Sequence, residues 1–240
     1  MDRKIKYIDL GGDILNFDKK KWNQDLKNLR NIIKKEDTFN KSKELFFDIY
    51  KSVHESLKLD INNMTYEDEL WNGMDEKIFK KSINKNGRTI AYGIWHSTRI
   101  EDITMNLLVA EDRQIIDCYN FKERVNSPIY NTGNQLTSKE ILEISEKIDM
   151  YELREYRKKV FEKSIEIVKD IKYLDLKKKV SKEGIDKILL LGAVSQNKEA
   201  IWLIDFWRKK TVAGILLMPC LRHNMVHLNE SFEAKKRKKK

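Results

Sequence analysis

Residues 89–108, TIAYGIWHSTRIEDITMNLL, decide the fold that we expect for this chain. Apolar and aromatic side chains recur there at intervals of three or four residues, which is the period of an α-helix with one buried face. That face carries, in order, Tyr92, His96, Ile100, Ile103 and Leu107. The pattern therefore predicts a helix whose buried side includes a histidine.

A pair of histidines occurs near the other end of the chain. His223 and His227 are four residues apart, and a helix places such residues one above the other on one face. Two stacked imidazoles can chelate a divalent cation, and a third on a facing helix completes a site with open positions. We predict that His96, His223 and His227, the histidine triad, bind a divalent metal. The zincin motif is excluded, because Asn224 stands where it requires glutamate.

Three further side chains are each open to two interpretations. Glu230 follows His227 by three residues, so it is either a catalytic base or outer carboxylate of the site, or a surface acid of the last turn. Cys220 precedes His223 by about one turn and is either a soft fourth ligand that favours zinc or a small apolar filler. His54 lies at the edge of another apolar face, where we expect a capping or surface residue.

The remaining periodicities predict an all-α fold, a four-helix bundle with an extra N-terminal helix and long connecting loops. The extra helix covers about residues 18–35, and the principal helices cover about residues 38–59, 89–108, 149–172 and 198–230. Thr137 and Asp149 each begin a capping-box pattern, which predicts a short helix and then the third principal helix.

Two long connections separate these helices. Residues 62–86 form a polar connection, and residues 110–136 form the longest loop, in which Ile115 and Ile116 can pair briefly as a strand. Pro219 lies inside the last predicted helix, where it either kinks the helix or begins a new first turn.

The composition fits one reduced, cytoplasmic domain. The chain has 240 residues and two prolines, and its two cysteines, Cys118 and Cys220, are too isolated to suggest a disulfide framework. No apolar stretch is long enough for a signal-peptide core or a membrane span. We expect a single domain over residues 1–232 and a basic disordered tail over residues 233–240.

The net charge of +10 depends largely on that tail. Residues 235–240, KKRKKK, carry six positive charges, and +4 remains when these are set aside. A nucleic-acid interface usually shows a stripe of lysine and arginine with interleaved aromatic side chains, whereas the lysines here are scattered. We therefore expect no specific nucleic-acid partner and no membrane partner.

Two segments resemble the DinB-like family of bacterial helical-bundle proteins. They are residues 94–106, IWHSTRIEDITMN, and residues 222–230, RHNMVHLNE. The family carries one histidine on its second bundle helix and a His-x-x-x-His motif on its last. The resemblance, which covers about residues 38–232, implies that the histidine triad binds a divalent metal, Ni²⁺ or Zn²⁺. Some members transfer low-molecular-weight thiols, which implies a small-molecule thiol as substrate.

The chain departs from the family after its last histidine. The family often has Arg-Gly-Gln there, whereas this chain has Leu228, Asn229 and Glu230, so no role of that arginine is carried over.

Three functional hypotheses follow. The first is a metal-dependent transferase in which the metal activates a small thiol. The second is a hydrolase that uses metal-bound water, with Glu230 as the base. The third is a non-catalytic, metal-stabilised module that binds a partner or forms a homodimer through an exposed helix face, with Trp202, Phe206 and Trp207 as candidate contacts.

Overall fold

A computed structural model describes residues 17–58 and 63–237 of the chain. The described residues form helices joined by turns and loops, and they contain no strand beyond two isolated backbone bridges. The all-α prediction is therefore confirmed. No helix among the described residues combines the length and the apolar character needed to cross a membrane.

The chain alternates long helices with short helical turns. In order, the elements are α1 (Lys19–Ile32), α2 (Phe39–Lys51), α3 (Tyr66–Trp71), α4 (Glu76–Lys81), α5 (Ile90–Asp102), η2 (Ile103–Val109), η3 (Ile115–Asp117), α6 (Phe121–Arg124), α7 (Ser138–Lys147), α8 (Met150–Asp170), η4 (Tyr173–Lys177), α9 (Lys182–Leu190), α10 (Lys198–Arg208), α11 (Val212–Ile215), η5 (Leu216–His223) and α12 (Asn224–Arg237).

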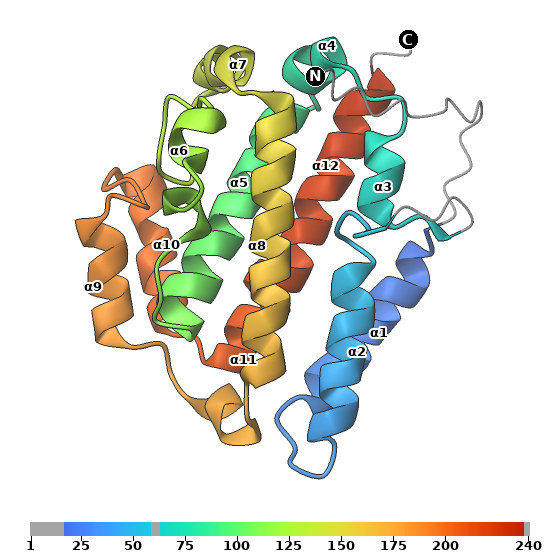
Figure 1. The fold of residues 1–240 in the computed structure, drawn as a ribbon, viewed down its shortest axis with the longest axis vertical. Coiled ribbons are helices and arrows are strands. Elements are labelled where there is room, and N and C mark those ends of the chain that lie inside the picture. Colours follow the sequence, from blue (N-terminus) through green and yellow to red (C-terminus); the bar gives the residue numbers. More distant parts are fainter. Residues whose placement is uncertain (1–16, 59–62, 238–240) are drawn as a thin grey trace.

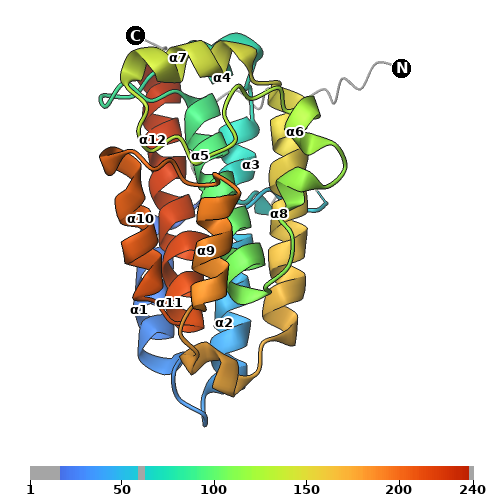
Figure 2. The ribbon, with the colours of Figure 1, turned by 90° about the vertical axis from the view of Figure 1, so that its left-hand side faces the viewer.

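Two of the longest helices, α8 and α12, pack on α5 (Figure 1). α5 contacts α8 on one side and α12 on another, while α1 packs on α2 and both reach η5. α9 and α10 form an outer pair (Figure 2), in which α9 packs on η2. α4 and α7 lie together over the end at which α5 begins. As a result α5 is enclosed, and all 13 of its residues are buried.

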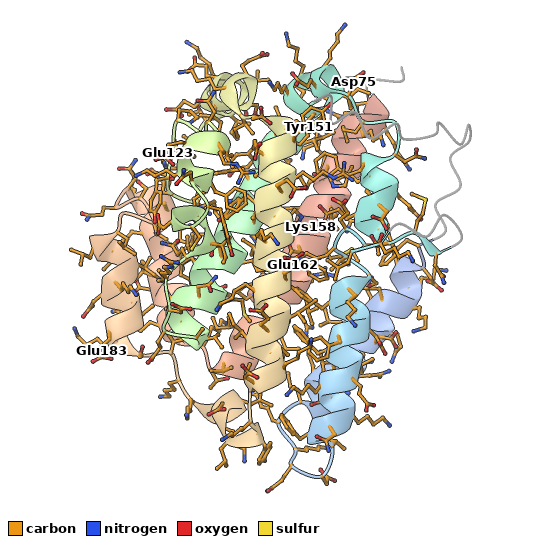
Figure 3. The ribbon with its side chains drawn as sticks, viewed as in Figure 1. Asp75, Glu123, Tyr151, Lys158, Glu162 and Glu183 are labelled. Atoms are coloured by element: carbon orange, nitrogen blue, oxygen red, sulfur yellow. The ribbon has the colours of Figure 1, made fainter. Side chains whose placement is uncertain are left out.

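The outer face of the molecule is polar along α8. Tyr151, Lys158 and Glu162 lie along the solvent side of this helix (Figure 3), whereas Leu153, Tyr156 and other apolar side chains on its opposite side are buried. The amphipathic pattern predicted for the third principal helix is thus realised.

Two principal helices are shorter than predicted. The helix predicted over residues 38–59 ends at Lys51, and the chain then turns so that His54 is buried. The pattern over residues 198–230 allowed a helix that either continues or restarts near Thr211, and the structure has the restart: one helix ends at Arg208 and a new one begins after Thr211, whose hydroxyl accepts a hydrogen bond from the Gly214 amide. A side-chain cap inside an apolar pattern therefore marks a second start.

The connections contain more helix than predicted. Residues 62–86 include α3 and α4, which begin at the caps Thr65 and Asp75. The strand suggested at Ile115 and Ile116 is wrong, since these residues form the 3₁₀ turn η3. Their amides donate to the Asp102 carboxylate at 2.8 and 3.0 Å, so they have no strand partner.

The last helix also extends beyond its predicted end. α12 continues to Arg237, so residues 233–237, which the sequence pattern assigned to the tail, are helical. Lys235 donates from Nζ to the carbonyls of Leu70, at 2.7 Å, and of Asn72, which fastens this part of α12 to the end of α3. Residues 238–240 of the predicted tail lie outside the described residues.

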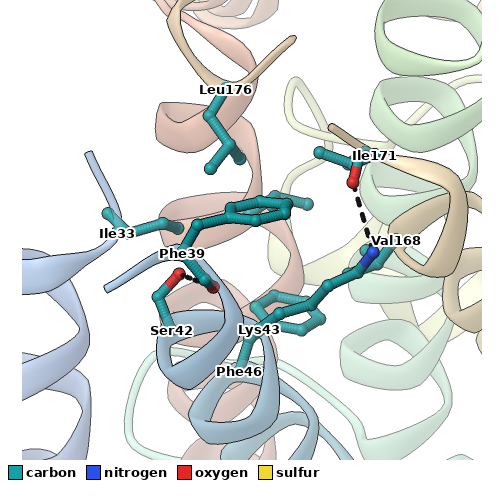
Figure 4. Close-up of a pocket in the computed structure, with 9 residues that line it drawn as sticks. Ile33, Phe39, Ser42, Lys43, Phe46, Val168, Ile171 and Leu176 are labelled. Atoms are coloured by element: carbon teal, nitrogen blue, oxygen red, sulfur yellow. Dashed lines mark hydrogen bonds between the residues drawn. The ribbon is translucent and has the colours of Figure 1, made fainter. Parts of the chain in front are cut away.

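An apolar cavity lies between the α1–α2 turn and the end of α8 (Figure 4). It has a volume of about 10 Å³, enough for about one water molecule. Lys43 closes one side, where its Nζ donates to the Ile171 carbonyl at 3.2 Å. The lining is otherwise largely aliphatic and aromatic, and none of the three histidines belongs to it.

Candidate metal centre

The structure brings the histidine triad together. His96 comes from α5, His223 ends η5, and His227 lies on α12. One ring nitrogen from each lies within 4.8 Å of the other two, and the Nε2 atoms of His223 and His227 are 3.1 Å apart. Since Zn–N bonds measure about 2.0–2.1 Å, a tetrahedral site needs nitrogens roughly 3.3 Å apart. Three histidines thus lie close enough to bind one metal ion.

Close contact between α5 and α12 makes this convergence possible. A side chain at Gly93 would place its Cβ 3.0 Å from Ser231 Oγ on α12, so a glycine is what lets the two helices approach. Ser231 in turn donates to the His227 carbonyl at 2.8 Å. The helix carrying His96 therefore lies directly against the helix carrying His227.

The loop before α7 is fastened along one face of α5. Its residues 130–133 present four consecutive carbonyls, each accepting a hydrogen bond from α5. Arg99 Nε donates to residue 130 at 3.0 Å, and Trp95 Nε1 to residue 131 at 3.2 Å. His96 Nδ1 donates to residue 132 at 2.7 Å, and the Tyr92 hydroxyl to residue 133 at 3.2 Å. We call this arrangement the carbonyl clasp.

The clasp fixes the tautomer of His96. Because the Thr132 carbonyl can only accept, Nδ1 carries the hydrogen and Nε2 keeps its lone pair for a metal. Burial lowers the pKa of His96 to about 4; the Thr132 bond opposes this shift and the positive charge of Arg88 adds to it. The ring is therefore neutral at pH 7, the form that binds a metal.

A carboxylate holds the second ligand from outside. Glu230 Oε2 lies 3.0 Å from His227 Nδ1, and Arg88 Nη1 donates to both Glu230 oxygens at 3.0 and 3.1 Å. Burial, followed by the neighbouring positive charges, holds the pKa of His227 well below its usual value. Burial and the other two histidines do the same for the pKa of His223.

His223 differs from the other two ligands in its surroundings. Its residue is partly exposed, whereas His96 and His227 are buried; its Nδ1, like that of His227, makes no hydrogen bond to any described residue. Cys220, the possible fourth ligand, is fully buried and does not belong to the ligand group formed by the triad. Burial raises the pKa of its thiol well above the ordinary value, which fits the apolar filler.

Of the two expectations for His54, the surface position is wrong, whereas the capping role fits its contact with a carbonyl in the last turn of α2. Its side chain is buried, and its Nδ1 and Nε2 lie 2.9 Å from the Tyr50 carbonyl and 3.2 Å from Glu101 Oε2. Burial raises the pKa of Glu101, but His54 and the hydrogen bonds lower it further, so the carboxyl is ionised. Both ring nitrogens thus lie beside oxygen atoms that can accept a hydrogen bond.

A buried polar network, unpredicted from the sequence, joins this ion pair to the triad. Asn224, next to His223, donates from Nδ2 to Glu101 Oε2 at 2.6 Å and to the Cys220 carbonyl at 2.9 Å. Its Oδ1 accepts from Arg157 Nη1 at 3.1 Å, and Arg157 pairs with Glu67 at 2.7 Å. One signal of this network was present in the sequence: the charged residues at positions 99, 101 and 102 occur within the otherwise largely apolar segment that forms the enclosed helix α5.

Comparison of the chain with protein-family models gives no match, and comparison with curated proteins gives none either.

Proposed function

We propose that this protein is a DinB-like metalloprotein, in which α2, α5, α8 and α11–α12 form a four-helix bundle that holds a divalent ion at the histidine triad. The convergence of three neutral imidazoles within 4.8 Å carries the proposal. Nitrogen donors of this kind suit Zn²⁺ and Ni²⁺. His96 also has an outer hydrogen-bond partner at Nδ1, as ligating histidines usually do, and Glu230 Oε2 lies 3.0 Å from Nδ1 of His227.

The function that we infer is a transferase acting on a small-molecule thiol. When bound, the ion would supply Lewis acidity that makes a thiol nucleophilic near neutral pH. The chain's own residues orient the ligands: Thr132 fixes His96, and Glu230 supports His227. Glu230 lies on the Nδ1 side of that ring and is engaged by Arg88, which favours a holding role over the alternative role of a base in a hydrolase.

Loss of one ligand should remove the metal. We expect the untagged wild-type protein to contain about one divalent ion per chain by elemental analysis, and His96→Ala to contain less than about a tenth of that, because two imidazoles alone bind weakly. Cys220→Ala is the matched control and should keep the metal, since its buried thiol lies outside the ligand group. Full stoichiometry in His96→Ala would exclude this site.

The reaction class is tested separately with the metal-loaded protein. Thiols are paired with a panel of electrophiles, and simple esters and amides are assayed in parallel. Thiol consumption that depends on His223 supports the transferase. Hydrolysis without thiol consumption supports the hydrolase, and a metal-dependent rise in melting temperature without turnover supports the non-catalytic module.

A further inference from the structure

Arg88, which binds Glu230, is itself held firmly beside the triad. Its amide donates to Asn84 Oδ1 at 3.1 Å and its carbonyl accepts from the Asn84 amide at 3.0 Å, so the turn before α5 is fixed. The guanidinium lies 6.0 Å from the centre of the Tyr92 ring, which itself stacks on His96 at 5.4 Å. The side chain is thus placed one aromatic ring away from a metal ligand.

One edge of this guanidinium is available to a ligand. Arg88 binds Glu230 through Nη1 alone, and its Nε and Nη2 make no hydrogen bond to any described residue. The side chain is 38% exposed, so solvent reaches part of it. The Nε–Nη2 edge is one of the two faces with which arginine binds a carboxylate in a bidentate manner.

The balance of charges around the triad also favours an anionic ligand. The three imidazoles are neutral, Arg88 is balanced by Glu230, and Arg157 is balanced by Glu67. The nearby carboxylate of the buried network, Glu101, is paired with His54. A divalent ion would therefore have two positive charges that no described carboxylate offsets. Buried charges are stable only when they are paired.

We propose that the substrate is a dianionic small molecule, with one donor group at the triad and a carboxylate on the Nε–Nη2 edge of Arg88. This inference rests on the proposed metal site. It names the substrate class and makes Arg88 the residue that determines specificity.

Two hydroxamates with the same metal-binding head test this assignment. Succinic acid monohydroxamate ends in a carboxylate, and butanohydroxamic acid ends in a methyl group on a chain of the same length. Both are titrated calorimetrically into the full-length protein loaded with zinc. We expect the carboxylate form to bind about tenfold more tightly, as for one partly exposed charge-assisted pair.

Three variants locate the preference. Arg88→Gln should abolish the preference for the hydroxamate that ends in a carboxylate. Arg88→Lys should retain only part of this preference, because lysine keeps the positive charge but lacks the planar guanidinium group. Arg124→Gln is the matched control and should keep the full ratio. Arg124 is 37% exposed and paired with Glu152, as Arg88 is with Glu230, but it lies between α6 and α8.

The outcomes separate this inference from the metal site itself. Equal affinities for the two hydroxamates in the wild type, or an unchanged ratio in Arg88→Gln, overturn the role of Arg88 and leave the metal site standing. Zinc content is measured in the same samples. If Arg88→Gln loses zinc, the ratio in Arg88→Lys decides instead. A wild-type protein that takes up no zinc overturns both proposals.

Discussion

Glu101 joins side chains from three other parts of the fold at a single carboxylate. It accepts hydrogen bonds from Tyr50 on α2, from Ser164 on α8 at 2.8 Å and from Asn224 on α12 at 2.6 Å, and it pairs with His54. A buried charge of this kind is costly to desolvate, so its partners decide whether it stabilises the fold. All four partners are present, and together they fix how the helices around α5 meet.

Removal of that charge should be costly. Glu101→Gln breaks the buried pair with His54 and removes the charge that the other hydrogen bonds converge on, and we expect the free energy of unfolding to fall by about 3 kcal/mol in urea denaturation. Glu162→Gln is the control, because Glu162 pairs with Lys159 on the outer side of α8 at 2.6 Å, and it should change stability by less than about 0.5 kcal/mol. Equal losses in the two variants would show that the Glu101 network does not stabilise the fold.

The site was only partly predictable at this scale. The four-residue spacing of His223 and His227 places both rings on one helix face, and the apolar stripe around His96 turns that ring inward. The Thr132 carbonyl could not be predicted, because every residue has a carbonyl and a loop gives no periodic signal. His54 was misplaced because its burial depends on the turn that follows α2, which helical periodicity does not describe.

Among the properties of the elements, the type of each helix and the positions of its ends were the hardest to predict from the sequence. α5 passes into the π-helical segment η2. Pro219 lies inside the π-helical segment η5, which ends at His223 and leads into the helix that carries His227. Such segments occur frequently near functional sites, but the apolar spacing that predicts a helix does not separate them from α-helix. The start of α7 was predicted correctly, because the Thr137 capping box depends on local chemistry.

The packing of α9 on η2 depends on a missing side chain. A Cβ at Gly184 would lie 2.8 Å from the Leu107 carbonyl, which is backbone and cannot move aside. We expect Gly184→Ala to lower the free energy of unfolding by about 1–3 kcal/mol. Gly214→Ala is the matched control, since its Cβ would meet only the Lys210 side chain at 3.4 Å, and it should be neutral or stabilising by up to about 1 kcal/mol. Chemical denaturation of both variants measures the difference; a tolerated Gly184→Ala would mean that α9 moves freely on η2.

For the whole molecule, the sequence predicted the helical class and the inward faces, whereas the arrangement of the outer helices had to come from the structure. α10 was expected as part of the last principal helix, but it packs with α9 outside the central helices. There Trp207 is buried, while Trp202 remains 50% exposed. A homodimer through that surface stays a prediction.

Stability of the metal-free protein should depend on pH through the triad. Burial lowers the pKa of His96 to about 4, and the pKa values of His223 and His227 shift in the same direction. The unfolded chain protonates its histidines near about pH 6.5, so below that value it binds more protons than the folded chain. The free energy of unfolding should therefore fall as the pH drops from about 6.5 toward 4, by about 3 kcal/mol for His96 alone.

Urea denaturation in the presence of a chelator, at about pH 7.5 and about pH 5, measures this dependence. His96→Gln removes one of the three histidines and should lose less stability between the two pH values than the wild type. An identical loss in both proteins would mean that His96 is not held neutral by the fold.

The carbonyl clasp has a consequence for how the chain can vary. Because four neighbouring acceptors each meet a different donor on α5, residues 130–133 cannot slide by one position without breaking every bond at once. A slip would also remove the Thr132 carbonyl from His96 Nδ1, and the hydrogen would then no longer be kept away from Nε2, the nitrogen proposed to bind the metal. We therefore expect insertions and deletions to be poorly tolerated within residues 130–133, where only one register satisfies all four donors.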